Sequence, residues 1–179
     1  MIRLFIAVAL LLGGDLYAQG AQPPLTEAQH EKTYEWRVRQ QELYGVYIPQ
    51  DLGEVFVQLT LLSDASDRAK FARLSEREAV TVPFFSLGRW MSHNWGFYGG
   101  SRLTVYLNEL KLHHPDDMTR FLLVMFHRHL NKKKLDPQPV IDGLLGMRQA
   151  AEQDRALQGE VIHEETRQLD SIPPPKGRE

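Results

Sequence analysis

The sequence predicts an all-α protein: a compact multi-helix domain with an N-terminal signal segment and a peripheral C-terminal helical arm. Apolar residues recur at spacings of three and four in several segments, as in helices with one buried face. Strand-like alternation of apolar and polar residues is absent. The predicted organisation is a signal peptide (1–20), a linker and peripheral helix (21–45), a helical domain (46–145), and a C-terminal helical arm with a disordered tail (146–179).

The first twenty residues predict a cleavable secretory signal. Arg3 supplies a positive charge, and residues 4–12, LFIAVALLL, supply a short apolar core. As a helix this core rises only about 13 Å, against roughly 30 Å of hydrocarbon, so it is too short to span a membrane. Cleavage is expected after Ala18 or Gly20, and a buried N-terminal helix is the alternative. We therefore expect a secreted, periplasmic protein with no membrane span after cleavage.

Composition restricts the possible partners and the source of stability. The chain has no cysteine, so neither a disulfide nor a lipid anchor on cysteine is possible, and an ordinary apolar core must stabilise the fold. The net charge is −2, whereas nucleic-acid-binding modules usually carry a basic face. The sequence therefore predicts no nucleic-acid partner.

The N-terminal half predicts a series of helices. A charged segment over 26–43 starts with Thr26 as a helix cap and forms a peripheral helix. Pro49 is expected in the first turn of the next helix, with Asp51 at its positive end. The buried stripe of that helix comprises Leu52, Val55, Phe56, Leu59 and Leu62. Two short helices follow over 65–74 and from Ser75, where Glu78 completes a capping box.

The next segments predict two helices joined at a corner. One face of the first carries Phe84, Leu87, Met91 and Trp95. Gly96 and the pair Gly99–Gly100 interrupt it, because glycine adopts left-handed conformations without steric cost. Ser101 then caps a second helix, whose inner stripe comprises Leu103, Tyr106, Leu107 and Leu110.

The segment 115–130 predicts the central buried helix. Pro115 suits its first position, and Asp116 and Asp117 favour the positive end of its dipole. Its residues are apolar nearly all round, and Asn131 ends it. Beyond Pro139 apolar residues are sparse, so this part is expected to be a long exposed helix or a partly ordered arm.

The motifs for catalysis and metal binding are missing. Six residues form a tempting metal-ligand set: His113, His114, Asp116, Asp117, His127 and His129. Helical zinc ligands are usually three or four residues apart, whereas these histidines are adjacent or two apart. No G-x-S-x-G, S-x-x-K or P-loop motif occurs, and no spacing pairs two carboxylates across a cleft. We therefore predict no catalytic residue, no metal and no cofactor.

The corner at residues 93–102, HNWGFYGGSR, permits two interpretations. In the structural one, the tryptophans pack in a joint between helices and Arg102 pairs with Asp116 or Asp117. In the functional one, aromatic rings and a guanidinium line a groove for a peptide, a glycan or a partner helix. The candidate binding residues are the polar and aromatic side chains at or beside the corner: Trp90, His93, Asn94, Trp95, Tyr98, Arg102, His114 and His127.

Several of these segments resemble an uncharacterised bacterial family of helical domains. The pattern is W-x3-N-W-G at 90–96, G-G-S-R-L at 99–103, H-P-D-D-M at 114–118 and H-R-x-L-N at 127–131, within a match from Ile48 to Leu145. The resemblance implies a small helical domain and brings no assigned activity, cofactor or catalytic residue.

The function that follows is a secreted, non-catalytic module that binds another protein. The alternative is a hydrolase of cell-envelope material, assisted by a metal ion. Geometry distinguishes the two: convergence of His93, His114 or His127 with Asp116 or Asp117 in an open pocket would favour the enzyme.

Overall fold

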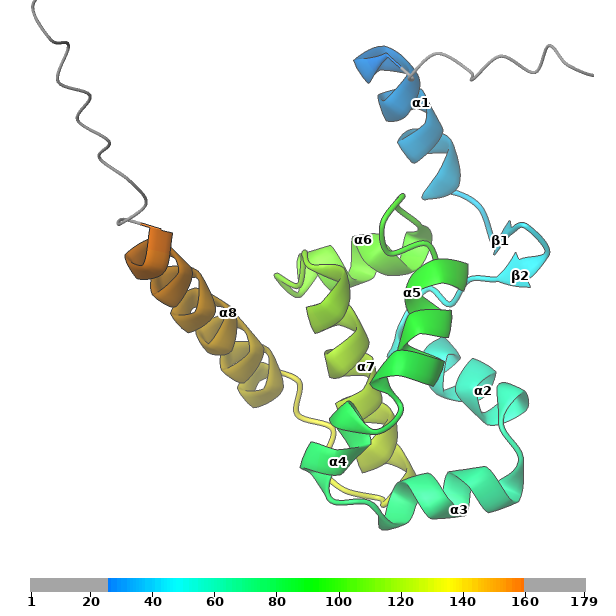
Figure 1. The fold of residues 1–179 in the computed structure, drawn as a ribbon. Coiled ribbons are helices and arrows are strands. Elements are labelled where there is room, and N and C mark those ends of the chain that lie inside the picture. Colours follow the sequence, from blue (N-terminus) through cyan, green and yellow to red (C-terminus); the bar gives the residue numbers. More distant parts are fainter. Residues whose placement is uncertain (1–25, 160–179) are drawn as a thin grey trace, which may run out of the picture.

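The computed structural model describes residues 26–159 and confirms the all-α prediction (Figure 1). The predicted signal segment, 1–20, and the predicted disordered tail lie outside the described residues. Among residues 26–159, no helix combines the length and the hydropathy needed to cross a membrane. The elements in chain order are α1 (Glu27–Arg37), β1 (Glu42–Leu43), β2 (Val46–Tyr47), α2 (Leu52–Leu62), α3 (Ala65–Arg73), α4 (Glu76–Thr81), the π-helix η1 (Phe84–Gly88), α5 (Arg89–Asn94), α6 (Arg102–Glu109), α7 (Pro115–Leu130) and α8 (Gln138–Gly159).

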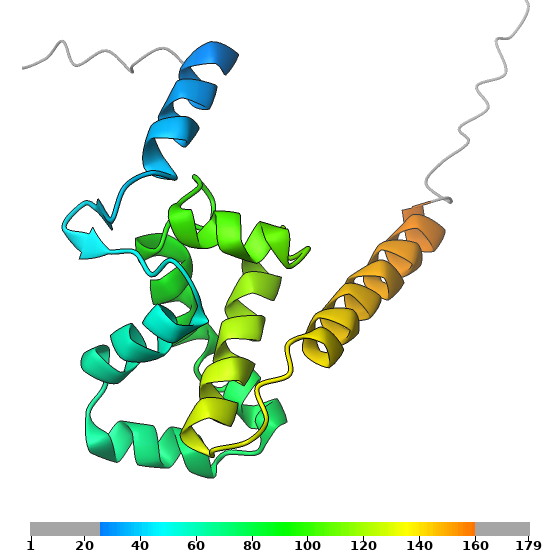
Figure 2. The same cartoon turned by 180° about the vertical axis from the view of Figure 1, so that it is seen from behind.

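Helix α7 is the centre of the fold, as its apolar sequence predicts. It contacts α2, α3, α4, η1, α5 and α8. Phe121, Leu122, Leu123 and Met125 are fully buried, and even the polar Thr119 is inaccessible. In Figures 1 and 2 the helices from α2 to α6 surround α7, while α1 and the far end of α8 extend beyond the body of the domain. The core therefore forms around one helix rather than between two layers.

The predicted N-terminal helix is shorter than expected. Its capping box at Thr26 and Gln29 is present, but α1 ends at Arg37 and the chain enters a two-residue antiparallel hairpin. The hairpin turn contains Tyr44 and Gly45, both with positive φ. Its strand residue Leu43 is buried in the core, a tertiary contact that a continuous exposed helix would not make. Tertiary packing thus overrides helix propensity at this point.

Helix α2 begins later than predicted. Asp51 is its N-cap, and the Asp51 carboxylate accepts the backbone N–H of Glu54 at 2.9 Å. Pro49 therefore precedes the helix rather than occupying its first turn. Val55, Phe56 and Leu59 are buried as expected, whereas Leu62 is exposed because the helix ends there at Ser63.

The corner forms where glycine was predicted to bend the chain. Gly96 and Gly100 have φ of 70° and 83°, in the left-handed region. Ser101 caps α6 and shares a capping box with Thr104. The lack of a side chain at Gly100 also lets Tyr34 of α1 pack against the corner, because a Cβ there would overlap the Tyr34 ring. The corner is consequently a packed joint.

Helix α8 returns alongside α7 and then leaves the core. Ile141 and Leu144 are buried against the domain, whereas the residues from 149 to 157 are exposed. The helix is continuous across 145–146, where the sequence analysis placed a boundary between domain and arm. One helix thus provides both a packed segment and a projecting one.

Candidate functional site

The structure places the two corner tryptophans in a packing role. Trp95 is fully buried, and Trp90 is half-buried with its ring edge-on to Trp95, at 5.7 Å between centroids. The Trp95 indole nitrogen has no hydrogen-bond partner among the described residues. Asn94 donates its side-chain amide to the Trp90 carbonyl at 2.8 Å. These three residues hold the corner together.

Three further candidates make structural contacts elsewhere. The expected pairing of Arg102 with Asp116 or Asp117 is wrong. Arg102 instead donates to the Ile48 carbonyl at 2.6 Å and pairs with Glu54 at 3.1 Å, because α6 packs beside the start of α2. His114 is the N-cap of α7 and accepts the Asp116 N–H at 3.2 Å. His127 is buried, with Nε2 2.9 Å from the Leu74 carbonyl.

The two remaining candidates, His93 and Tyr98, line an open hollow. This hollow, of about 420 Å³, also has Phe85, Arg89 and Asp116 in its wall. Phe85 and Tyr98 are 83% and 77% exposed, unusually high for aromatic side chains. His93 and Asp116 therefore line one hollow but form no hydrogen bond or ion pair with each other, and His114 and His127 do not line it. Within residues 26–159 no group of three or more potential metal ligands occurs.

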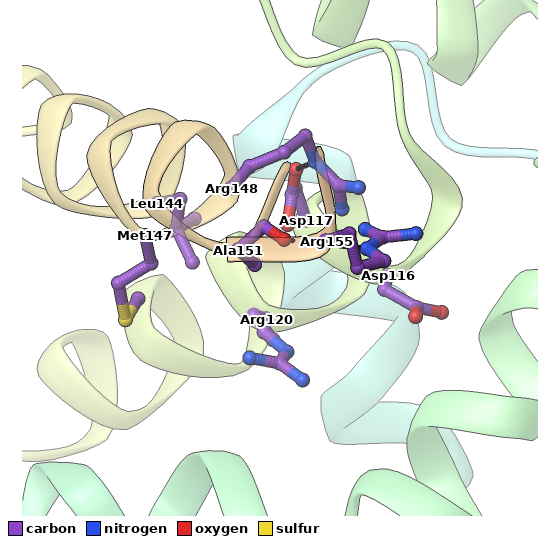
Figure 3. A pocket seen from close by; sticks show the side chains of 8 residues that line it. All are labelled: Asp116, Asp117, Arg120, Leu144, Met147, Arg148, Ala151 and Arg155. Carbon is purple, nitrogen blue, oxygen red and sulfur yellow. Dashed lines mark hydrogen bonds and ion pairs between the residues drawn. The ribbon is translucent and has the colours of Figure 1, made fainter. Parts of the chain in front are cut away.

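A second region, which the sequence analysis missed, lies between α7 and α8. Asp117 on α7 is buried and accepts a hydrogen bond from Arg148 on α8 at 2.5 Å (Figure 3). The Asp117 carboxylate holds the pKa of the Arg148 guanidinium above its ordinary value, chiefly through this hydrogen bond. Beside the pair is a hollow of about 170 Å³, whose wall also includes Asp116, Arg120 and Arg155. The ion pair tethers α8, and the hollow opens next to it.

A larger and more apolar hollow continues from this one. It has a volume of about 360 Å³ and shares Arg120, Leu144 and Met147 with the hollow beside the Asp117–Arg148 pair. Its other wall is α4, including Val80, and Figure 1 shows α4 and α8 on the same side of α7. We call the two joined hollows the Arg120 groove. Its floor on α7 comprises Asp116, Arg120, Val124 and Arg128.

Arg120 occupies the middle of this groove without a polar partner. It makes no ion pair or hydrogen bond within the described part of the chain, and its Nε is buried and unsatisfied. Its guanidinium lies over the Phe84 ring, 5.2 Å from the centroid, and Phe84 lines the hollow that contains His93. Cation–π stacking fixes the plane of the guanidinium but leaves its hydrogen bonds unused. Arg120 can therefore receive a carboxylate or another anion from outside.

One signal in the sequence pointed to Arg120. It is a charged residue within the apolar helix MTRFLLVMFHRHL, where any arginine must pair, stack or reach solvent. The pairing of Arg148 with Asp117 depends on how α8 returns along α7, which no local pattern in the sequence indicates.

Comparison with known families confirms the resemblance to an uncharacterised domain. Residues 48–130, a little under half of the chain, match the family model of a domain of unknown function, DUF6794. The match begins at Ile48 as expected and ends at Leu130, not Leu145. No curated protein and no solved structure shows significant similarity to the chain. The matched region supplies α4, η1 and α7, so one wall of the Arg120 groove, α8, lies outside it.

Proposed function

We propose that this protein, whose central region matches a domain of unknown function, is a non-catalytic module that binds another protein outside the cytoplasm. The Arg120 groove is the proposed binding surface. The observation that carries the proposal is an unpaired, stacked guanidinium beside apolar side chains such as Val80 and Met147. Arginine and aromatic side chains in partly desolvated positions contribute most of the affinity in protein interfaces.

The groove geometry suits binding better than covalent chemistry. The carboxylates of Asp117 and Glu76 are each paired with an arginine, and these ion pairs occupy oxygens that a general base would need for a substrate. Asp116 lines the groove, and no second unpaired carboxylate of the described residues lines it. Recognition of a partner needs only the shape, the apolar walls and the free cation.

Photo-crosslinking tests the surface directly. Benzoyl-phenylalanine at Met147, which is 58% exposed in the groove, is compared with the same group at Val57, which is 56% exposed on α2. In cells of the native host, Met147 is expected to yield a discrete protein adduct that weakens when Arg120→Gln is added. Val57 serves as the control. Equal adducts at both positions, or none at Met147, would refute the proposal.

The extracytoplasmic location is supported by the predicted signal at residues 1–20. Val8 lies in the middle of its apolar core, so Val8→Arg places a charge where the signal needs apolar residues. The native protein is expected in the extracytoplasmic fraction with a new N-terminus at residue 19 or 21. The Val8→Arg protein is expected to stay in the cytoplasm at full length. An uncleaved native chain in the cytoplasm would contradict this location.

The hydrolase remains a second candidate because His93 and Asp116 line one hollow. If the protein cleaves cell-envelope polymer, His93→Ala should abolish the release of soluble fragments, and a chelator should do so if a metal ion assists. Arg120→Gln separates the two functions, since it should weaken partner binding and leave hydrolysis unchanged. No fragment release by the native protein would eliminate this candidate.

A further inference from the structure

We infer that the Arg120 groove takes an acidic amphipathic helix of about four turns from the partner protein. This inference rests on the proposed function and specifies the chemistry of the partner. Helices α7 and α8 line the groove along its whole length, and α4 adds a second wall to its apolar part. On α7 and α8 the lining residues repeat with helical spacing.

The length of the groove favours a helical occupant. On α8 its lining includes Val140, Leu144, Met147, Ala151 and Arg155, a straight stripe with spacings of three and four. At 1.5 Å per residue this stripe is roughly 22 Å long, or about four helical turns. Amphipathic helices bind in such grooves through apolar residues repeated at the same spacing.

The charge of the groove favours an acidic occupant. Two of its arginines, Arg128 and Arg148, pair with Glu76 and Asp117. The remaining charged side chains along it are three arginines and one aspartate, none of which forms an ion pair with another described residue: Arg77, Arg120, Arg155 and Asp116. The groove is thus locally basic although the whole chain carries a net charge of −2. Carboxylates on one face of a partner helix would neutralise this excess.

A glycine on α8 leaves space for close approach of a partner helix. Gly143 lies in the second turn of α8 and lines the groove, and a Cβ there would meet no atom within 4 Å. Glycine inside a helix costs roughly 1 kcal/mol relative to alanine, and no contact among the described residues requires it at this position. A helix packed against Gly143 would use the space, since small residues let two backbones come close.

A pair of synthetic peptides tests the inference with the full-length mature protein. Both are fluorescein-labelled helices of about 18 residues with a leucine stripe, long enough for the four turns of the groove. One carries glutamates on the flank of that stripe, and the other carries glutamines at the same positions. By fluorescence anisotropy, the glutamate peptide should bind at least roughly tenfold more tightly at low salt, as charge-assisted hydrogen bonds predict. Its advantage should shrink as salt is raised.

Matched variants test whether the preference for the glutamate peptide arises in the Arg120 groove. Arg120→Gln should remove most of the glutamate preference, whereas Arg39→Gln, which removes an exposed cation between α1 and β1, should leave it intact. Gly143→Leu should weaken both peptides, because it fills the groove while leaving the folded chain unstrained. Thermal melts of each variant verify folding. Equal affinity for both peptides, or a preference untouched by Arg120→Gln in a folded protein, would overturn the inference.

Two other possible occupants of the groove, the C-terminal segment of the same chain and a second copy of the protein, can be detected with cysteine and leucine variants. Because the chain has no cysteine, Gly143→Cys with Leu169→Cys forms a disulfide only if its own C-terminal segment reaches the groove. Rapid formation of that disulfide would assign the groove to this segment, and a concentration-dependent dimer lost in Gly143→Leu would assign it to a second copy. Either result overturns the inference. A Met147 adduct together with equal peptide affinities would preserve the proposed function and refute only the acidic helix.

Discussion

Arg128 and Arg120 lie two turns apart on α7 and line the same hollow, yet their surroundings differ. Arg128 makes two hydrogen bonds to Glu76, at 2.6 and 3.1 Å, and a third to the Asp136 carbonyl. Arg120 lies over a phenylalanine ring and has no anionic partner among residues 26–159. One arginine thus joins α4 to α7, whereas the other is free for the ligand that we propose. Substitutions can test this division of roles.

The largest effect is expected at the ion pair that tethers α8. Asp117→Asn leaves Arg148 without its carboxylate, and the pair is mostly buried, with side-chain exposures of 8% and 25%. We expect the free energy of unfolding to fall by about 2–4 kcal/mol, since breaking a buried pair strands a charge. Urea denaturation measures the loss. Asp116→Asn, at a carboxylate without an ion pair in the described chain, is the control and should change little.

A smaller loss is expected for Arg128→Gln. The substitution strands the Glu76 carboxylate, but Glu76 is 36% exposed and water compensates in part. The expected fall in unfolding free energy is about 1–2 kcal/mol. In a double-mutant cycle with Glu76→Gln, the coupling energy between the two side chains should account for most of this loss of unfolding free energy. An additive cycle would show that Arg128 is not a structural arginine.

The Arg128–Glu76 ion pair predicts that the free energy of unfolding depends on pH. The Arg128 guanidinium, through its hydrogen bond, lowers the pKa of Glu76 below 4.5 in the folded state. A lowered carboxyl pKa stabilises the fold above the unfolded-state pKa, and this contribution is lost as pH falls through the folded-state pKa. The stability difference between the native protein and Glu76→Gln should be constant above about pH 5.5 and narrow below about pH 4.5. Denaturation midpoints at several pH values test this, and a difference independent of pH would refute it.

The smallest effect on stability is expected for Arg120→Gln. Because this side chain forms no ion pair with a described residue, its removal costs only the stacking on Phe84, about 0.5–1 kcal/mol. By contrast, Arg120→Gln should strongly weaken binding of the glutamate peptide. If Arg120→Gln destabilises the protein as much as Arg128→Gln does, the contrast between the two arginines fails.

Local patterns in the sequence predicted the helices that depend on local interactions. The capping box at Ser75 and Glu78, the proline start of α7 and the glycines of the corner are all where they were expected. Each of these features lies within a few residues of its partners, so its signal is contained in one segment.

The remaining features depend on contacts between distant segments. Leu43 lies in a strand rather than in the predicted helix, because its side chain packs in the core. Arg102 pairs with Glu54, 48 positions earlier in the chain. The candidate list concentrated on the conspicuous corner residues, of which Trp95 lies in the core. The charge of Arg120 within an apolar helix is visible in the sequence, but its place in a groove depends on α4 and α8 packing beside α7.

The π-helix η1 carries Phe84, so the contact of Phe84 with Arg120 depends on the number of residues in this turn. A π turn contains one more residue than an α turn, and such turns are found as single-residue expansions of ordinary helices. Loss of one residue between Phe84 and Gly88 would restore regular winding and rotate the preceding chain by about 100° about the axis. Phe84 would then leave Arg120, whereas Gly88, where a Cβ would lie 2.7 Å from Thr119, would keep its position. A shorter homologue with a more regular helix would therefore be expected to lack the contact between Arg120 and Phe84.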